Sequence, residues 1–304
     1  VGMRQKGKWW KVIDDHTCFI SDKRIEELFA QIRSWTQEAN LSFFDRKAHT
    51  GLLRYAVIRA TRTGETMINI VTSQANEEED LVRTALTKLN ETIKPSTLIW
   101  SQNSTISDVS YGDILETISG PGVIEETIRG SRFRISPNAF FQTNSHGAEL
   151  LLDTVDEFCG DLGDKTLLDL YCGSGFFSVA LGSQARKTIG VEFIEEALED
   201  ARVNAKLNEV DVEYHHAKTE EFDWSKFNAD VVILDPPRSG MHDKALEDVL
   251  RILPETIIYV SCNPKNFARE MVQLQNAYQV ESMRAIDMFP HTPHVELVTK
   301  LTKI

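Results

Sequence analysis

The chain has 304 residues, a formal net charge of −13 and 41% hydrophobic residues. This length is enough for about two domains, and the composition is ordinary for a globular protein. No run of eighteen apolar residues occurs, which excludes a membrane-spanning helix, and the acidic charge argues against a broad surface that coats nucleic acid.

Residues 1–6 lack the apolar core of a signal peptide. The four cysteines are widely spread and show no paired spacing of the kind that binds a metal. Free, scattered cysteines fit a reducing compartment. We therefore expect the protein in the cytoplasm or, in a eukaryote, in an organellar matrix.

In the first half of the chain, the sequence pattern predicts two helices and several strands. We expect the strands to pair with strands near them in sequence. A strand or two is expected within residues 1–20. Apolar residues spaced three and four apart at 22–39 are typical of an amphipathic helix, as is the pattern at 77–90. Strands at 52–59 and 66–71 flank a glycine turn and predict a hairpin. Further short strands are expected at 98–100, 114–118, 123–128 and 133–135.

The pattern changes after Ser136-Pro137 to strands that alternate with helices, as in a doubly wound sheet. The expected helices are 147–158, 178–181, 195–207, 244–251 and 265–274. The expected strands are 166–170, 188–191, 212–214, 231–234, 256–260, 279–288 and 295–301.

The loop between the last two strands is too short for a parallel crossover, so we expect an antiparallel pair there. By fold analogy, a mostly parallel seven-stranded sheet that ends in such a pair is typical of class I (Rossmann-like) methyltransferases. We therefore predict an α/β domain at 136–304, preceded by a mixed α+β domain at 1–135.

A glycine turn follows the strand predicted at 166–170. Gly173 and Gly175 permit a tight turn and a close approach of the backbone to a ligand. Asp169 precedes the turn, and Glu192 ends the next strand, where an acid can accept hydrogen bonds from ribose hydroxyls. A nicotinamide cofactor would use the same acid, so the loop predicts a nucleoside-bearing cofactor without deciding which one.

A second loop, Asp235-Pro236-Pro237-Arg238, follows the buried strand predicted at 231–234. Its two prolines fix a stiff, extended wall beyond the strand. Asp235 can accept a hydrogen bond from a cofactor or a substrate, and Arg238 is a forked cation suited to a base edge or a phosphate. A simple proline-rich turn is the alternative interpretation.

Cys262 ends the apolar strand predicted at 256–260. Because ligands of open α/β sheets lie beyond the carboxyl ends of the strands, we expect this thiol to face a cleft and to be a nucleophile. Such chemistry needs a base, and Glu296 is the candidate. His291 or His294 could orient Glu296 or tune the thiol. Inert packing of the cysteine and structural roles for the histidines are the alternatives.

Five stretches together resemble the TrmA/RumA family of S-adenosylmethionine-dependent RNA 5-methyluridine (uracil-C5) methyltransferases. They lie, in the family's order, at 136–144, 169–175, 235–240, 259–264 and 289–296. The resemblance covers the C-terminal half and extends more loosely to residues 1–7 and 120–126, which look like the family's central domain. It implies that residues 1–135 hold RNA.

By this resemblance Cys262 would add to C6 of a uracil and load electron density onto C5, which then takes the methyl group. Glu296 would remove the C5 proton. Asp235 and Arg238 would lie near the target uridine, flipped out of the RNA stack. The expected S-adenosylmethionine contacts are Gln142, Asp169, Tyr171, Gly173, Gly175, Glu192 and Asp235.

Two family features are not matched. Many members begin with a small β-barrel RNA-binding domain, for which this chain has no room. Some members hold an iron–sulfur cluster, but only Cys18 stands where a cluster ligand would fall, and one cysteine cannot hold a cluster. We therefore predict no metal, and a monomer that acts on structured RNA, either tRNA or rRNA.

Other functions stay open from the sequence. The same fold serves methyltransferases that act on cytosine C5 or on an exocyclic amine, and the amine version would need neither Cys262 nor Glu296. A non-catalytic RNA-binding protein that kept the fold is an alternative from another class. A nicotinamide enzyme is the third.

Overall fold

The computed structural model describes residues 2–5, 7–8, 11–14, 18 and 20–304. The chain divides into two compact units. The first comprises Val1–Glu125 with Ser136–Asn138, and the second comprises Glu126–Ile135 with Ala139–Ile304. Within the described residues no helix is long and apolar enough to cross a membrane.

The first unit is built on a four-stranded sheet. The strand order is β3 (Leu53–Ala60), β4 (Thr66–Ser73), β5 (Thr97–Asn103) and β6 (Ile114–Ser119). The predicted β3–β4 hairpin is confirmed. β4 and β5, however, pair in parallel, so this unit contains a crossover as well as the local hairpins that the sequence indicated.

Two helices cover one face of this sheet, α1 (Lys23–Glu38) and α2 (Glu79–Ile93). Their apolar stripes pack against Ile68, Ile70 and Leu98 of the sheet. The indole of Trp35 also donates to the carbonyl of Ala85, at 2.9 Å. The helices therefore form where the spacing of apolar residues predicted them, because only packing on the sheet buries those stripes.

Two short pairs of strands lie outside the four-stranded and seven-stranded sheets. β1 (Gly2–Arg4) and β2 (Val12–Asp14) pair antiparallel. β7 (Ile124–Ile128) and β8 (Ser131–Ile135) form a second two-stranded sheet. Most of the β7–β8 hairpin groups with the second unit, where Asn204 and Asn208 bond the backbone of β8.

The second unit is built on a seven-stranded sheet whose order is β11-β10-β9-β12-β13-β15-β14. The first five strands in this order are parallel, and β15 is antiparallel to both β13 and β14. The strands are β9 (Thr166–Leu170), β10 (Lys187–Glu192), β11 (Glu213–His216), β12 (Val231–Leu234), β13 (Thr256–Ser261), β14 (Tyr278–Ile286) and β15 (Glu296–Lys303). The predicted class I α/β fold is thereby confirmed.

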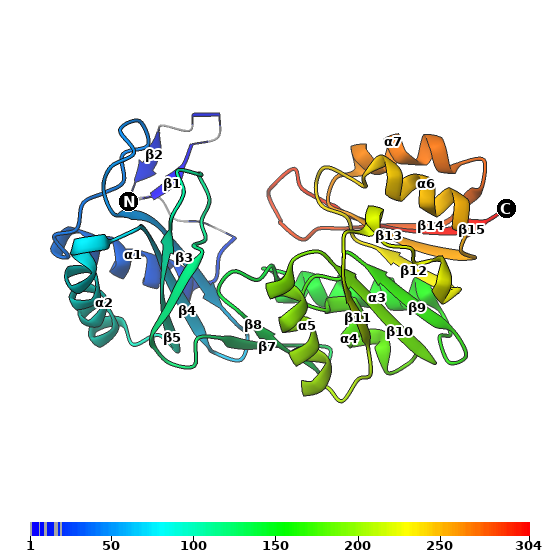
Figure 1. The fold of residues 1–304 in the computed structure, drawn as a ribbon, viewed down its shortest axis with the longest axis horizontal. Helices are drawn as coiled ribbons and strands as arrows, with labels where there is room; N and C mark the ends of the chain where they lie inside the picture. The colour runs from blue at the N-terminus through cyan, green and yellow to red at the C-terminus, as the bar shows by residue number, and fades with distance from the viewer. Residues whose placement is uncertain (1, 6, 9–10, 15–17, 19) are drawn as a thin grey trace. The chain divides into compact units, whose positions relative to one another are not determined.

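Helices cover both faces of this sheet, as Figure 1 shows. On one face α6 and α7 bury their apolar sides with Trp224 against β9, β12 and β13. On the other face lie α3, α4 and α5. The helices are α3 (Ser145–Cys159), α4 (Phe176–Gly182), α5 (Glu195–Leu207), α6 (Asp243–Ile252) and α7 (Pro264–Leu274). Because both faces are covered, the central strands are mostly apolar rather than alternating, with Asp169 of β9 a buried exception.

Candidate active site at the carboxyl edge of the large sheet

The strand register brings the predicted site residues to one edge of the sheet. Leu170 pairs with both Val191 and Leu234, so the ends of β9, β10 and β12 lie at the same level. Leu234 in turn pairs with Tyr259 of β13. The glycine turn, Glu192, Asp235 and Cys262 all follow these strand ends. They therefore share the cleft position that open α/β sheets use for ligands.

The glycine turn has the strained backbone that only glycine adopts freely. Gly173 and Gly175 have φ angles of 54° and 82°. A side chain at Gly175 would also clash, because its Cβ would lie 2.7 Å from the hydroxyl of Tyr214. From α5, the Asn204 amide donates to the carbonyl of Ser174 at 3.0 Å. The turn is thus fixed to α5 through one of its carbonyl groups.

Asp169 lies under the glycine turn and is fully buried. Its Oδ2 accepts a hydrogen bond from the backbone N–H of Ser178 at 2.9 Å, and its Oδ1 has no partner among the described residues. Burial raises the pKa of this carboxyl to about 7. A buried carboxylate with an unused acceptor is costly unless a ligand supplies a donor.

Because the folded-state pKa of Asp169 lies above its ordinary value of 3.8, the folded protein binds this proton more tightly than the unfolded chain. Its contribution to stability is present below about pH 4 and is lost as the pH rises through 7. We expect Asp169→Asn to flatten the decline in the free energy of unfolding between pH 5 and 8, by about 4 kcal/mol at most. Urea unfolding across this range measures it. Asp164→Asn, at an exposed position, is the control, and parallel curves for Asp169→Asn and the wild type would contradict the expectation.

Glu192 is held against the same turn. Its Oε2 accepts from the backbone N–H of Gly173 at 3.0 Å, and its Oε1 accepts from those of Phe193 and Ile194. A carboxylate oxygen has two lone pairs, so Oε2 keeps acceptor capacity. The sequence prediction placed an acid here, and the structure shows that its orientation is fixed by backbone donors.

Gln142 and Tyr171 flank the turn. The hydroxyl of Ser174 donates to the carbonyl of Phe140 at 3.4 Å, and the rings of Phe141 and Phe176 lie edge to face. These contacts bring the segment that carries Gln142 to the glycine turn. Tyr171 has a left-handed backbone, with a φ of 65°, and packs partly against the core of the sheet. Both side chains are half-buried.

Cys262 and Glu296 are brought together by the pairing of β13 with β15. Ser261 pairs with Leu297 in this antiparallel ladder. The ladder ends with this pair, and Cys262 follows Ser261 while Glu296 precedes Leu297. The two residues therefore lie next to the last pair of the ladder, and the charge of Glu296 acts on the Cys262 thiol. Residues separated by more than thirty positions in sequence thus become neighbours at the edge of the sheet.

The charges around Cys262 act in opposite directions. Burial raises the pKa of the thiol, and the carboxyl groups of Glu296 and Asp235 raise it further. Arg238 lowers it, through its charge and through a hydrogen bond to the side chain of Cys262. Arg238 is therefore the one neighbour among these that favours the thiolate.

The pKa of Glu296 is raised by burial, against the opposing effect of Arg238. Burial, together with the charges of Glu296 and Asp169, also raises the pKa of Asp235 well above its usual value. A carboxyl group with a raised pKa is better matched to proton transfer near neutral pH. The arrangement can therefore supply a nucleophile and a base within one cluster.

The family model of the tRNA (uracil-5-)-methyltransferases matches residues 123–304. A tRNA (uracil(54)-C(5))-methyltransferase of Pyrococcus furiosus is 40% identical over 305 residues, which cover 100% of this chain and 71% of that protein. The chain belongs to the tRNA (uracil-5-)-methyltransferase family. An uncharacterized RNA methyltransferase of Caldanaerobacter subterraneus is 41% identical over 309 residues, with 100% of this chain and 68% of the relative covered.

A solved member of this family has the same fold. The crystal structure of Pyrococcus abyssi tRNA (uracil-54, C5)-methyltransferase in complex with S-adenosyl-L-homocysteine matches with a TM-score of 0.86. It is 37% identical, and the match covers 99% of this chain and 72% of that one. The resemblance to the family that the sequence motifs indicated is thus confirmed.

The histidines of the last loop are less involved than the sequence indicated. His291 and His294 are exposed, and neither imidazole makes a hydrogen bond within the part of the chain that the structure describes. In the first unit the carbonyl of Cys18 accepts from Ser21. No group of three or more His, Cys, Asp or Glu side chains that could hold a metal occurs among the described residues.

Several side chains that support the site were not singled out from the sequence. Asn204 bonds the glycine turn from α5, and the Tyr214 hydroxyl, on β11, lies beside Gly175 and 3.3 Å from the Ser178 hydroxyl. Asn266 and Glu270, on α7, bond the backbone that follows Asp235-Pro236-Pro237. Their spacing is that of any helix face, so only the tertiary structure reveals their role.

Proposed function

We propose that the second unit transfers a methyl group from S-adenosylmethionine to C5 of a uridine in tRNA, with Cys262 as the nucleophile and Glu296 as the base. The observation that carries the proposal is the β13–β15 ladder, whose last pair, Ser261 with Leu297, is followed by Cys262 on one strand and preceded by Glu296 on the other. Both lie at the sheet edge that also carries the glycine turn. A C5-methylation mechanism needs these two groups in reach of one pyrimidine ring.

The residues at this edge fit S-adenosylmethionine. The orphaned acceptor of Asp169, the spare acceptor capacity of Glu192 and the open backbone of Gly173 suit a ligand with amino and hydroxyl donors. A Cβ at Gly173 would meet nothing within 4 Å, so the space beside it is open. Gln142, Tyr171, Gly175 and Asp235 complete the proposed contacts. When bound, the cofactor supplies the methyl group that is transferred to C5.

The chain's own residues carry the remaining chemistry. The Cys262 thiolate forms a bond to C6 of the uracil, and the electron pair of the C5–C6 double bond moves to C5 and the O4 carbonyl. Arg238 stabilises the thiolate before the addition. The Asp235-Pro236-Pro237 wall and Arg238 are the proposed contacts to the uridine, which leaves the RNA stack to reach the thiol.

Glu296 completes the turnover. Once C5 carries both the methyl group and its original proton, the Glu296 carboxylate accepts that proton. The C5–C6 double bond then re-forms, the bond between C6 and the Cys262 sulfur breaks, and the free thiolate returns. The raised pKa of Glu296 favours this acceptance near neutral pH.

The test is a methyl-transfer assay with labelled S-adenosylmethionine and a tRNA transcript, followed by mass spectrometry of the hydrolysed nucleosides. We expect 5-methyluridine. A methylated cytidine or an N-methylated base would instead support one of the alternative methyltransferases. Cofactor binding without any methylated nucleoside, from tRNA or rRNA fragments, would favour the non-catalytic alternative.

We also propose that the first unit contacts the RNA through a pocket of about 220 Å³. The Arg54 guanidinium lies 4.4 Å from the centre of the Phe44 ring and donates to the carbonyls of Thr105 and Ser107. Phe44 is half-buried, and Ile106, which lines the same pocket, is 71% exposed. Fixed aromatic and guanidinium planes are the surfaces on which unstacked bases bind.

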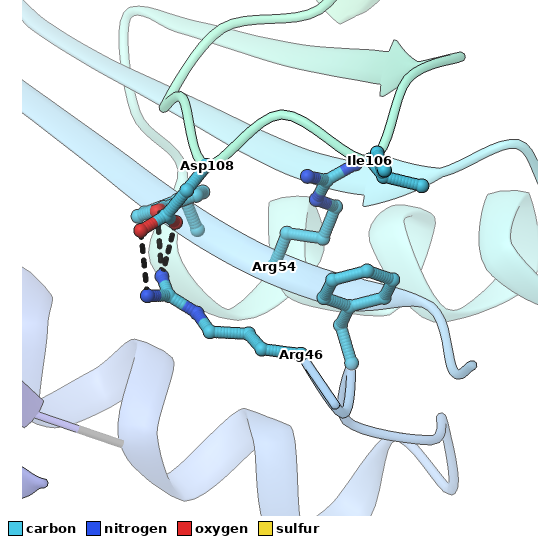
Figure 2. Close-up of a pocket in the computed structure, with 6 residues that line it drawn as sticks. Arg46, Arg54, Ile106 and Asp108 are labelled. Atoms are coloured by element: carbon cyan, nitrogen blue, oxygen red, sulfur yellow. Dashed lines mark hydrogen bonds and ion pairs between the residues drawn. The ribbon is translucent and has the colours of Figure 1, made fainter. Parts of the chain in front are cut away.

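The second arginine of this pocket is also held in place. Figure 2 shows Arg46 reaching Asp108, and Arg46 also bonds the Tyr55 hydroxyl at 2.7 Å. Residues 43–62 contain five Lys or Arg and one Asp, in a chain whose net charge is −13. Positive charge is thus concentrated beside the partly exposed Phe44 ring, which favours a nucleic-acid contact over an ordinary surface.

We expect Arg54→Ala to raise the KM for tRNA about tenfold and to leave kcat at saturating tRNA unchanged, because one stacking contact is lost. Steady-state methyl transfer measures both constants. The matched control is Arg83→Ala, since Arg83 lies in the same unit and is paired with Glu116. An unchanged KM in Arg54→Ala would remove the pocket from the proposed RNA contact.

The expected oligomeric state of the protein is a monomer. Light scattering of the purified protein would check this expectation.

A further inference from the structure

Hydrogen bonds from Asn263 and from helix α7 hold the backbone turn that follows Pro237. We call this set of contacts the clamp. The Asn266 amide donates to the carbonyl of Arg238 at 2.6 Å, and the Asn263 amide donates to the same carbonyl at 3.2 Å. Arg269 reaches the carbonyl of Ser239 at 3.4 Å. One face of α7 therefore bonds the main chain of the turn at successive residues, while the Arg238 side chain is left to point elsewhere.

Glu270 is the buried centre of this clamp, with only 2% of its surface exposed. Its Oε1 accepts from the backbone N–H of Met241 at 3.0 Å, and its Oε2 accepts from the hydroxyl of the fully buried Tyr259 at 2.6 Å. Arg269 lies 3.3 Å from Oε1. A buried carboxylate that accepts several hydrogen bonds fixes the groups that donate to it, because leaving any of them unpaired is costly.

The turn is shaped to admit this carboxylate. Gly240 has a φ of 87°, and a Cβ there would lie 2.1 Å from Oε1 of Glu270. Its N–H also closes the turn on the carbonyl of Pro237 at 2.8 Å. Only glycine allows the chain to turn and to approach the carboxylate this closely. The prolines stiffen the chain before Arg238, and α7 fixes it afterwards.

The clamp lies next to Cys262, the proposed nucleophile. The Asn263 amide, one residue after Cys262, donates to the Arg238 carbonyl, so the clamped backbone lies beside the residue that follows the thiol. Arg238 itself is exposed, and its charge acts to lower the pKa of the Cys262 thiol and of Glu296. Holding an arginine at one partner costs side-chain and backbone conformational entropy, and a backbone that is already fixed removes the second cost. We propose that Asn266 and Glu270 are positioning residues that hold the Arg238 guanidinium beside the Cys262 thiol, an inference that rests on the proposed role of Cys262.

The test is the pH dependence of Cys262 alkylation by iodoacetamide, followed by peptide mass spectrometry, which needs neither RNA nor cofactor. Arg238 opposes burial, Glu296 and Asp235 in setting the thiol pKa. Losing its charge in Arg238→Met should therefore move the alkylation midpoint upward, by about one pH unit. Asn266→Ala should move the midpoint in the same direction by roughly half as much.

The decisive comparison is the double variant. If Asn266 acts through Arg238, Asn266→Ala adds no shift in the Arg238→Met background. Equal shifts in both backgrounds, or no shift in the single variant, would overturn the proposal. Gln273→Ala, at an exposed position on α7, is the matched control and should leave the midpoint unchanged.

Glu270→Gln is the second variant, because it keeps the size of the side chain and tests the clamp if Asn266→Ala is unstable. The glutamine side chain keeps one acceptor oxygen but places N–H groups against the other donors. We therefore expect the alkylation midpoint to move upward in this variant as well. Thermal melts separate unfolding from repositioning. Methyl transfer by the wild type tests the proposed function separately, since an unchanged alkylation midpoint contradicts the clamp even when 5-methyluridine forms.

Discussion

Cys262→Ala is expected to abolish formation of 5-methyluridine, with a loss of at least about a thousandfold in kcat, because the substitution removes the proposed nucleophile that adds to C6. A sharper test uses as substrate an RNA that contains 5-fluorouridine. Fluorine at C5 cannot leave as a proton does, so the wild-type protein and S-adenosylmethionine should give a covalent adduct that survives denaturation. The adduct should be missing in Cys262→Ala.

The control for this experiment is Cys18→Ala, which removes a partly buried thiol from the first unit. It should form the adduct as the wild type does. An adduct that persists in Cys262→Ala would mean that another residue attacks the base. Retained methyl transfer without any adduct would instead point to an exocyclic amine as the target, because that reaction needs no thiol.

Glu296→Gln is expected to stop the reaction one step later. A glutamine keeps the shape of the side chain but cannot accept the C5 proton, so the thiolate is not expelled after methyl transfer. We expect a covalent complex with ordinary, unfluorinated RNA and a fall in kcat of about 10²- to 10⁴-fold, the range of a lost general base. Denaturing gel electrophoresis with labelled RNA detects the complex.

Glu281→Gln provides the matched control, because Glu281 lies on the neighbouring strand β14 and is paired with Lys300. It should turn over normally. If His291→Ala, rather than Glu296→Gln, accumulates the complex, the base has been misassigned. The exposure of His291 and the burial of Glu296 favour the carboxylate.

The sequence indicates the site well wherever a residue lies at the end of a buried strand. Asp169, Glu192, Asp235 and Cys262 each follow an apolar run that is long enough to be recognised, and parallel strands end at one edge. The helices were also predictable, because their apolar stripes are regular. The beginning of β15 at Glu296 follows from the same kind of run.

Contacts made by tertiary packing could not be predicted in this way. The parallel pairing of β4 with β5 depends on how α2 packs, which the strand sequences do not specify. Glu270 is a charged residue on an amphipathic helix, where sequence favours a solvated position. The pocket beside Phe44 arises where the β3–β4 register shifts between Leu53 and Tyr55, and such a bulge redirects neighbouring side chains.

The pairing of β13 with β15 has a consequence for variation in the enzyme. Since Glu296 is the first residue of β15 and pairs with Ile286 of β14, its backbone is held by the sheet and not by the 287–295 loop that precedes it. Insertions or replacements in that loop can therefore diversify what the site accepts while the two side chains proposed to react keep their places at the end of the ladder. A slip of one residue in the ladder, by contrast, would turn one of them to the opposite face. Substrate choice and chemistry are thus free to evolve separately.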